Sequence, residues 1–244
     1  MIRKFEEISN NAWPALRVFQ YDGWLLRFAN GVTKRSNSVS LLYPSTLDPV
    51  TKIAFCEDLY RSAGIPPCLK VTPDSEPKEI DRILEEQGYT IHSHISFQTA
   101  SLKEMSGERD PQVFLEEKPD PEWIDHFIHM NGFDIARKPT YLAILEQLVL
   151  PVTTATIFRD GKVAAVGLGV LEDRYLGIFD IVVDPAFRKR GLGYTVTSAL
   201  MQRGREMGAD TAYLQVLCDN LPALRLYERL GFREIYRYWY RMKD

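Results

Sequence analysis

One segment of the sequence, from Phe179 to Tyr194, restricts the possible folds more than any other. It begins with a run of β-branched and aromatic residues typical of a buried strand, which stops at Asp184-Pro185. Three basic residues follow, and Gly191-Leu192-Gly193 then leads into a helical pattern of apolar residues. Glycines let backbone N–H groups turn toward one point, and the helix N-terminus adds the positive end of its dipole. The segment therefore predicts a strand, an anion-binding loop and a helix in direct succession.

Three kinds of phosphate-binding loop contain glycines of this type, and their spacing separates them. A Walker loop requires Lys-Ser or Lys-Thr after its last glycine, but Gly193 is followed by Tyr194. A Rossmann loop requires a third glycine three places beyond Gly193, where Val196 stands. The remaining pattern is the pyrophosphate loop Arg/Gln-x-x-Gly-x-Gly/Ala, which Arg188, Gly191 and Gly193 satisfy.

Strand and helix patterns continue on both sides of this segment. Val152–Phe158 and Lys162–Val170 are rich in strand-forming residues and meet at Asp160-Gly161, a strong signal for a two-residue hairpin. The other elements expected in the second half are strands over Leu176–Val183, Ala212–Leu217 and Phe232–Met242, and helices over Gly191–Met207 and Pro222–Leu230, the latter ending at Gly231.

The first half repeats this order of elements. Its hairpin signal is Asp22-Gly23 and its helix-ending glycine is Gly88; these glycines are 65 positions apart, against 70 for their counterparts in the second half. This agreement predicts a duplicated α/β unit. The elements expected here are strands over Leu16–Phe19, Trp24–Phe28, Ser36–Tyr43, Leu69–Val71 and Tyr89–Thr99, and helices over Val50–Arg61 and Glu76–Gln87.

Polar residues crowd one strand-like segment of the first half, Gly31–Ser38. Such a strand fits the edge of a sheet, where one side faces solvent. The alternative is that Arg35 and Asn37 face a cleft between the two halves.

A polar, charged and non-periodic stretch, Ser101–Gln112, separates the halves and has the composition of a linker. We therefore expect one domain over residues 1–104 and a second over residues 112–244.

Charge and cysteine content exclude several classes of protein. The 30 Lys and Arg residues nearly balance the 33 Asp and Glu residues, so binding to nucleic acid or to an anionic membrane is not expected. The three cysteines are far apart and form no CxxC pattern, which argues against a disulfide framework and a structural zinc site. The acidic N-terminal residues do not resemble a signal peptide, and the longest apolar run, Ala164–Leu171, is too short to cross a bilayer. These features predict a cytoplasmic protein.

A second motif follows the loop in register. Asn220 stands 27 positions beyond Gly193 and begins NLPALRLYERLGF, which is similar to the Asn-x-x-Ala-x-x-x-Tyr-x-x-x-Gly-Phe segment of the GCN5-related N-acetyltransferases (GNAT). The strand with Val183-x-Pro185, the loop and the helix also match. The second half, about residues 112–244, therefore resembles this family.

The resemblance implies an α/β fold with two GNAT-like domains, each a mixed, largely antiparallel sheet flanked by helices. The first half has no Arg-x-x-Gly-x-Gly between its third strand and the following helix. It resembles a degenerate copy, as in the tandem members of the family, in which one copy binds CoA and the other is structural or shapes the substrate site.

The resemblance also implies an N-acetyltransferase that moves an acetyl group from acetyl-CoA to a primary amine of a small molecule or peptide, by direct attack in a ternary complex and without a metal. The end of the third strand would pair with the pantetheine arm and steady the thioester oxygen, and the loop would bind the pyrophosphate. The residues expected to bind acetyl-CoA are Ile181, Val182, Val183, Arg188, Lys189, Arg190, Gly191, Leu192, Gly193, Tyr194 and Asn220.

By the same resemblance, Tyr227 is the general acid that protonates the departing thiolate. The general base is less defined, because Gln215 stands where some members carry a glutamate, and an amide cannot accept a proton at neutral pH. Asp180 is a substitute, acting directly or through water, with a solvated strand residue as the alternative interpretation. Asp134 is a candidate to bind a cationic substrate. His126 and His129 are one helical turn apart but lack further metal-ligating neighbours, so we interpret them as surface residues.

Two other functions stay open. The missing glutamate is compatible with an acyl-CoA-binding sensor or scaffold that performs no turnover, although retention of Tyr227 argues against it. A protein N-terminal acetyltransferase is the second alternative, against which Gln215 and the additional domain weigh. The acceptor amine, the acyl-chain preference and the oligomeric state, a homodimer included, are left open.

Overall fold

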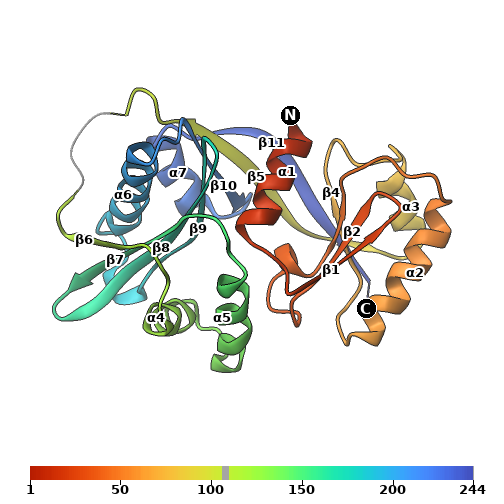
Figure 1. The fold of residues 1–244 in the computed structure, drawn as a ribbon, viewed down its shortest axis with the longest axis horizontal. Coiled ribbons are helices and arrows are strands. Elements are labelled where there is room, and N and C mark those ends of the chain that lie inside the picture. The colour runs from red at the N-terminus through yellow and green to blue at the C-terminus, as the bar shows by residue number, and fades with distance from the viewer. Residues whose placement is uncertain (106–109, 244) are drawn as a thin grey trace. The chain divides into compact units, whose positions relative to one another are not determined.

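The described residues, 1–105 and 110–243 of a computed structural model, form two compact units (Figure 1). Unit 1 contains Met1–Ser96, Leu217–Asp219 and the residues from Tyr236 onward. Unit 2 contains the described residues of Phe97–Val216, together with Asn220–Ile235. The linker expected at 101–112 includes residues 106–109, which lie outside the described part of the chain. The domain boundaries at 104 and 112 stay predictions.

The elements follow the order that the sequence predicts, with additional helices and a strand. The α-helices are α1 (Ile2–Ala12), α2 (Pro49–Ser62), α3 (Ile80–Glu86), α4 (Pro121–Asn131), α5 (Lys138–Glu146), α6 (Leu192–Glu206) and α7 (Leu221–Arg229). The strands are β1 (Arg17–Tyr21), β2 (Trp24–Phe28), β3 (Val39–Leu41), β4 (Cys68–Val71), β5 (Thr90–Ser101), β6 (Val113–Glu116), β7 (Val152–Arg159), β8 (Lys162–Glu172), β9 (Tyr175–Val183), β10 (Thr211–Leu217) and β11 (Arg233–Met242). Short 3₁₀ helices are η1 (Lys34–Ser36), η2 (Ile135–Arg137) and η3 (Pro185–Phe187).

Both predicted hairpins have the backbone that their Asp-Gly pairs favour. Asp22 and Gly23 have φ values of +42° and +83°, and Asp160 and Gly161 have values of +53° and +72°. A two-residue turn with positive φ at both central positions matches the twist of the strands that it connects. These turns fix the registers of β1 with β2 and of β7 with β8.

The order of strands confirms the duplication. Unit 1 has the order β1-β2-β3-β4-β11, and unit 2 has the order β6-β7-β8-β9-β10-β5. In unit 1, β1, β2 and β3 pair antiparallel in succession, and β3 pairs parallel with β4. In unit 2, β7, β8 and β9 pair antiparallel in succession, and β9 pairs parallel with β10. Each unit is therefore an α/β fold with a mixed, largely antiparallel sheet. Unit 2 adds β6 beyond β7, whereas β1 ends the order in unit 1.

The sheet of unit 1 has one apolar and one polar face. Its apolar face packs on α2 and α3 through side chains such as Trp24, Leu26 and Leu69. On the other face Lys70 of β4 lies in register with a serine of β3 and with Tyr240 of β11. The buried Lys70 ammonium forms a 2.7 Å ion pair with Glu6 of α1. Helix α1, which the sequence analysis did not predict, therefore closes a buried polar face.

The segment 31–38 is not an edge strand, and that prediction was wrong. Strand β3 begins only at Val39 and lies between β2 and β4. The polar residues before it form a compact loop around the buried side chain of Asn37, whose amide accepts from the backbone N–H groups of Ala29 and Gly31 and donates to the carbonyl of Thr33. The hydrogen bonds of the Asn37 side chain therefore stabilise the backbone of this loop.

Helices cover both faces of the sheet in unit 2. Figure 1 shows α6 on one side of β7, β8 and β9, and α4 on the other. Buried apolar residues of α6, such as Val196 and Leu200, pack on β8, where Gly167 and Gly169 leave room for them. Within the described residues, no helix has both the length and the apolar character that a membrane span requires.

Candidate functional site

Strand β9 contains a β-bulge at the point where the predicted site begins. Leu168 of β8 pairs with Phe179, but Val166 pairs with Val182, so Gly167 faces the two residues Asp180 and Ile181. Asp180 has a φ of +53°, a left-handed conformation that also occurs in one class of β-bulge. A Cβ on Gly167 would lie 2.5 Å from Ile181 Cδ1 and 2.7 Å from Val196 Cγ1, so a larger residue there would force these core side chains to shift.

Beyond the bulge, β9 separates from its parallel neighbour. The pairs between β9 and β10 run from Tyr175↔Thr211 to Ile178↔Leu214. Residues 179–183 lie past the last pair, although the side chains of Ile181 and Val183 still pack against the core of unit 2. The backbone edge that β9 turns toward β10 is therefore available at its C-terminal end to an extended ligand.

The loop between β9 and α6 is anchored at both ends and exposed in its centre. The Asp184 carboxylate accepts from the backbone N–H of Ala186 at 2.8 Å, and the ring of Phe187 is buried. Arg188, Lys189 and Arg190 are all exposed, and Arg188 Nε donates to the carbonyl oxygen of Val183 at 3.2 Å. The Arg190 guanidinium carbon lies 5.4 Å from the centroid of the Phe187 ring. The loop thus presents two further cationic groups, those of Lys189 and Arg190, to solvent.

Two left-handed residues turn the backbone just before α6. Lys189 has a φ of +61° and Gly191, the N-cap of α6, has a φ of +81°. The first turn of an α-helix leaves N–H groups without intrahelical partners, and Gly191 has no side chain to accept from them. The loop therefore combines exposed cationic side chains with the free backbone donors of a helix N-terminus, which is suited to a phosphate group.

Helix α7 packs tightly against the start of α6. A Cβ on Gly193 would lie 2.8 Å from Leu226 Cδ1 and 3.6 Å from Val183 Cγ2. Gly193 therefore lets Leu226 of α7 pack closely on α6, in addition to the ligand approach that the sequence suggests. Arg229 of α7 places its guanidinium carbon 5.1 Å from the centroid of the Tyr194 ring. Sequence analysis missed Arg229, because no spacing rule links it to a residue 35 positions earlier.

Tyr227 lies on the same helix, partly buried against the core of unit 2. Its ring meets that of Phe232 edge to face, with 5.8 Å between the centroids. Burial and, to a smaller extent, the carboxylate of Asp180 raise the pKa of Tyr227 to about 12. The phenol therefore keeps its proton at every physiological pH and remains a donor. The electrostatic influence of Asp180 also means that these two predicted catalytic residues are near one another.

The other predicted residues have identifiable structural roles. Asn220 is the exposed N-cap of α7, and its Oδ1 accepts from the N–H of Ala223 at 3.3 Å. Asp134 caps the short helix η2 by accepting from Ala136 N–H at 2.9 Å. His126 and His129 both lie on α4. No group of three or more metal-ligating side chains comes together within residues 1–105 and 110–243.

Several of the predicted residues of unit 2 thus lie next to one another. The end of β9, the loop 188–191 and the first turn of α6 are in direct contact through Val183, Arg188 and Gly193. Helix α7 adds Leu226 beside Gly193, and Tyr227 near Asp180.

Comparison with known proteins identifies the family. The family model described as "Probable histone acetyltransferase Rv0428c C-terminal" matches residues 1–241. The chain is 33% identical over 247 residues to "Uncharacterized N-acetyltransferase YobR" of Bacillus subtilis (strain 168), covering 99% of this chain and 98% of that protein.

Solved structures show the same fold. A GCN5-related N-acetyltransferase from Kribbella flavida superposes with a TM-score of 0.69 at 18% identity, covering 98% of this chain and 95% of its own. A tandem GNAT protein from the clavulanic acid biosynthesis pathway gives a TM-score of 0.61 at 14% identity, with 85% and 76% covered. The chain therefore belongs to the family described by that model, and it is an acyltransferase with the fold of the GCN5-related N-acetyltransferases.

Proposed function

We propose that this acyltransferase moves an acetyl group from acetyl-CoA to a primary amine of a small molecule or peptide. The observation that carries the proposal is the loop before α6, where the left-handed Lys189 and Gly191 expose backbone donors beside the end of β9 that has no pairs with β10. A phosphate-bearing donor with a long extended arm complements both features, because the loop suits its pyrophosphate and the strand edge suits its amides.

The proposed contacts to acetyl-CoA divide by chemistry. The N–H groups of residues 189–194 bind the pyrophosphate, and the exposed side chains of Lys189 and Arg190 add positive charge. The backbone of Ile181–Val183 pairs with the pantetheine arm, as an added strand would, and one of its N–H groups stabilises the thioester oxygen. Asn220 serves first as the cap of α7, which leaves its Nδ2 group for the CoA arm.

The proposed reaction is a direct displacement in a ternary complex. The lone pair of the amine nitrogen attacks the thioester carbonyl carbon, the C–S bond breaks, and the thiolate accepts the proton of the Tyr227 hydroxyl. The proton that the amine loses passes to the Asp180 carboxylate, directly or through water. The pKa of Tyr227, raised to about 12, keeps the donor fully protonated until the thiolate departs; the same shift makes the phenol a weaker acid than an ordinary tyrosine.

The first half of the chain is proposed to support this site without binding acetyl-CoA. Between β3 and α2 the sequence lacks the glycines and arginine of the loop. A cytoplasmic location is part of the proposal, and the three cysteines, all free, support it.

Calorimetric titration with acetyl-CoA, combined with release of free thiol in the presence of a pool of primary amines, tests the proposal. Lys189→Glu reverses a charge inside the loop, and Lys162→Glu makes the same change at the start of β8 as a matched control. We expect affinity for acetyl-CoA to fall by about tenfold or more only in Lys189→Glu, since hydrogen bonds and contacts between charged groups are worth about 1.5–3 kcal/mol. Binding without amine-dependent thiol release would favour the sensor. Equal loss in both variants would contradict the loop assignment.

A further inference from the structure

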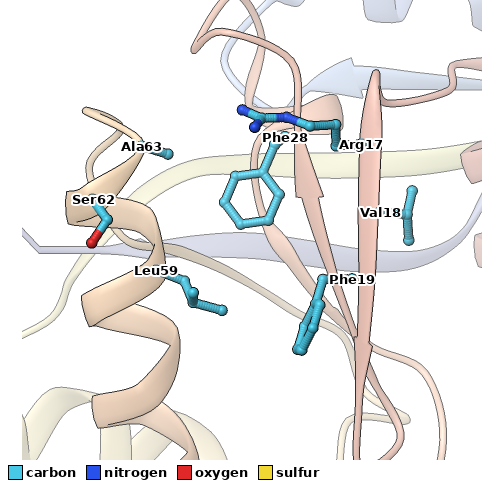
Figure 2. Close-up of a pocket in the computed structure, with 7 residues that line it drawn as sticks. All are labelled: Arg17, Val18, Phe19, Phe28, Leu59, Ser62 and Ala63. Carbon is cyan, nitrogen blue, oxygen red and sulfur yellow. The ribbon is translucent and has the colours of Figure 1, made fainter.

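Unit 1 contains a pocket of about 640 Å³ that the proposed acetyl transfer does not use (Figure 2). It lies between the strands β1 and β2 and the C-terminal end of α2, and its apolar walls include Phe19, Phe28 and Leu59. Pockets that bind small molecules have volumes of roughly 300–1,000 Å³ and combine apolar walls with a few polar groups. This pocket has two such groups, the guanidinium of Arg17 and the hydroxyl of Ser62.

Arg17 is placed by the register of the hairpin. It lies directly opposite Phe28 in the pairing of β1 with β2, so both side chains leave the same face of the sheet. The guanidinium carbon is 5.9 Å from the centroid of the Phe28 ring. Val18, the next residue, is opposite Arg27 and also lines the pocket (Figure 2).

The charge of Arg17 is not neutralised by the described residues. No ion pair joins Arg17 to a carboxylate within them, and none of the residues lining the pocket is acidic. A guanidinium offers five donors in a planar arrangement that matches a carboxylate. The guanidinium lies over the ring of Phe28, which is itself part of the pocket wall.

The internal repeat shows that this flank is incomplete in unit 1. In unit 2 the equivalent strand, β7, is covered by β6, and Val113 and Leu115 of β6 pack into the core beneath it. In unit 1 the strand order ends at β1, and Phe19 of β1 remains 45% exposed beside the pocket. An apolar group can therefore enter unit 1 at the place where unit 2 uses its own side chains.

We propose that this pocket binds a small monocarboxylic acid with an aromatic or branched apolar body. The carboxylate pairs with Arg17, and the apolar body lies between Phe28 and Leu59. The site belongs to unit 1, whereas the acetyl-CoA loop belongs to unit 2. The acid is therefore a second ligand, distinct from the acyl donor.

Titration of the full-length protein with phenylacetate, followed by NMR or calorimetry, tests this inference. The neutral isostere phenylacetamide separates binding of the carboxylate from binding of the ring. We expect phenylacetate to bind about tenfold more tightly than phenylacetamide, and Arg17→Gln to remove about that advantage. Arg82→Gln is the matched control, because Arg82 is an exposed residue of α3 whose ion pair is with Glu86 on its own helix.

A second variant keeps the test independent of charge. Leu59→Trp fills the pocket from α2 and is expected to abolish binding of phenylacetate, while the affinity for acetyl-CoA is unchanged. If Leu59→Trp does not fold, Arg17→Gln still tests the proposal. Arg17 is exposed on an edge strand, so its replacement is expected to leave folding intact. Equal binding of the acid and the amide, full affinity in Arg17→Gln, or no saturable binding of phenylacetate would each overturn the proposal.

Discussion

The left-handed backbone at Gly191 allows a test of the loop that separates ligand binding from folding. Gly191 has a φ of +81° and Gly161, in the hairpin between β7 and β8, has a φ of +72°. A Cβ added at either position would meet no atom within 4 Å. Alanine is therefore penalised at both positions by backbone conformation alone, which costs about 1–2 kcal/mol.

The two substitutions are expected to destabilise the protein equally and to differ in ligand binding. In a chain of this size, a loss of about 1 kcal/mol lowers the Tm by about 2–4 °C. Only Gly191 sets the direction of backbone N–H groups at the start of α6. If alanine relaxes toward negative φ, one such donor is lost to a charged phosphate, which is worth about 1.5–3 kcal/mol and predicts an affinity about 10–100-fold weaker.

Thermal unfolding by circular dichroism and calorimetric titration with acetyl-CoA measure the two effects on the same samples. We expect similar decreases in Tm for Gly191→Ala and Gly161→Ala, with weaker binding only in Gly191→Ala. Unchanged affinity in Gly191→Ala, with its Tm lowered, would refute the reasoning, because the strained backbone would then have no role in holding the ligand.

Three further predictions concern side chains. Tyr227→Phe should reduce amine-dependent thiol release by about 10²–10⁴-fold, with Tyr21→Phe as a control; full turnover in Tyr227→Phe across the pH range would contradict its assignment as the general acid. Glu6→Gln leaves the Lys70 ammonium buried without its partner, and should lower the free energy of unfolding in urea by about 3–5 kcal/mol. Adding Lys70→Met should recover part of that loss. If the losses of the two single variants simply add in the double variant, the pair is uncoupled. Asn220→Ala should cost about 1 kcal/mol of stability, whereas serine in Asn220→Ser can still cap α7. Weaker binding of acetyl-CoA by Asn220→Ser would therefore indicate a direct contact between Asn220 and the ligand. Full affinity would mean that Asn220 only caps the helix.

Local signals in the sequence were sufficient for most of the fold. The Asp-Gly turns predict both hairpins, since positive φ at two successive residues is favoured by few other pairs. Gly191 and Gly193 likewise locate the start of α6, because a left-handed N-cap and a close helix contact both require small residues. The duplication follows from the repetition of these signals.

Long-range features could not be predicted in the same way. The bulge at Asp180 depends on the packing of Ile181 against Gly167, which no local pattern encodes. The polar run before β3 was misread as an edge strand, because its hydrogen bonds converge on the buried Asn37 amide rather than on solvent. Helix α1 did have a local signal, since Phe5, Ile8 and Ala12 recur at helical spacing and are buried; only the pairing of Glu6 with Lys70, 64 positions away, could not be predicted.

The strand order of unit 1 has a consequence for how the protein is made. Strand β11 pairs with β4. The guanidinium of Arg241, on β11, donates hydrogen bonds of 2.8 and 2.9 Å to the Asp81 carboxylate of α3. A ribosome synthesises β11 only after every other strand of both units. Most of unit 1 is synthesised first, but its sheet stays incomplete until β11 has been made. Until then the backbone edge of β4 is unpaired and can pair with strands of other chains. Nascent chains that stall between α7 and β11 should therefore contain a folded core of unit 2 and an unfinished unit 1.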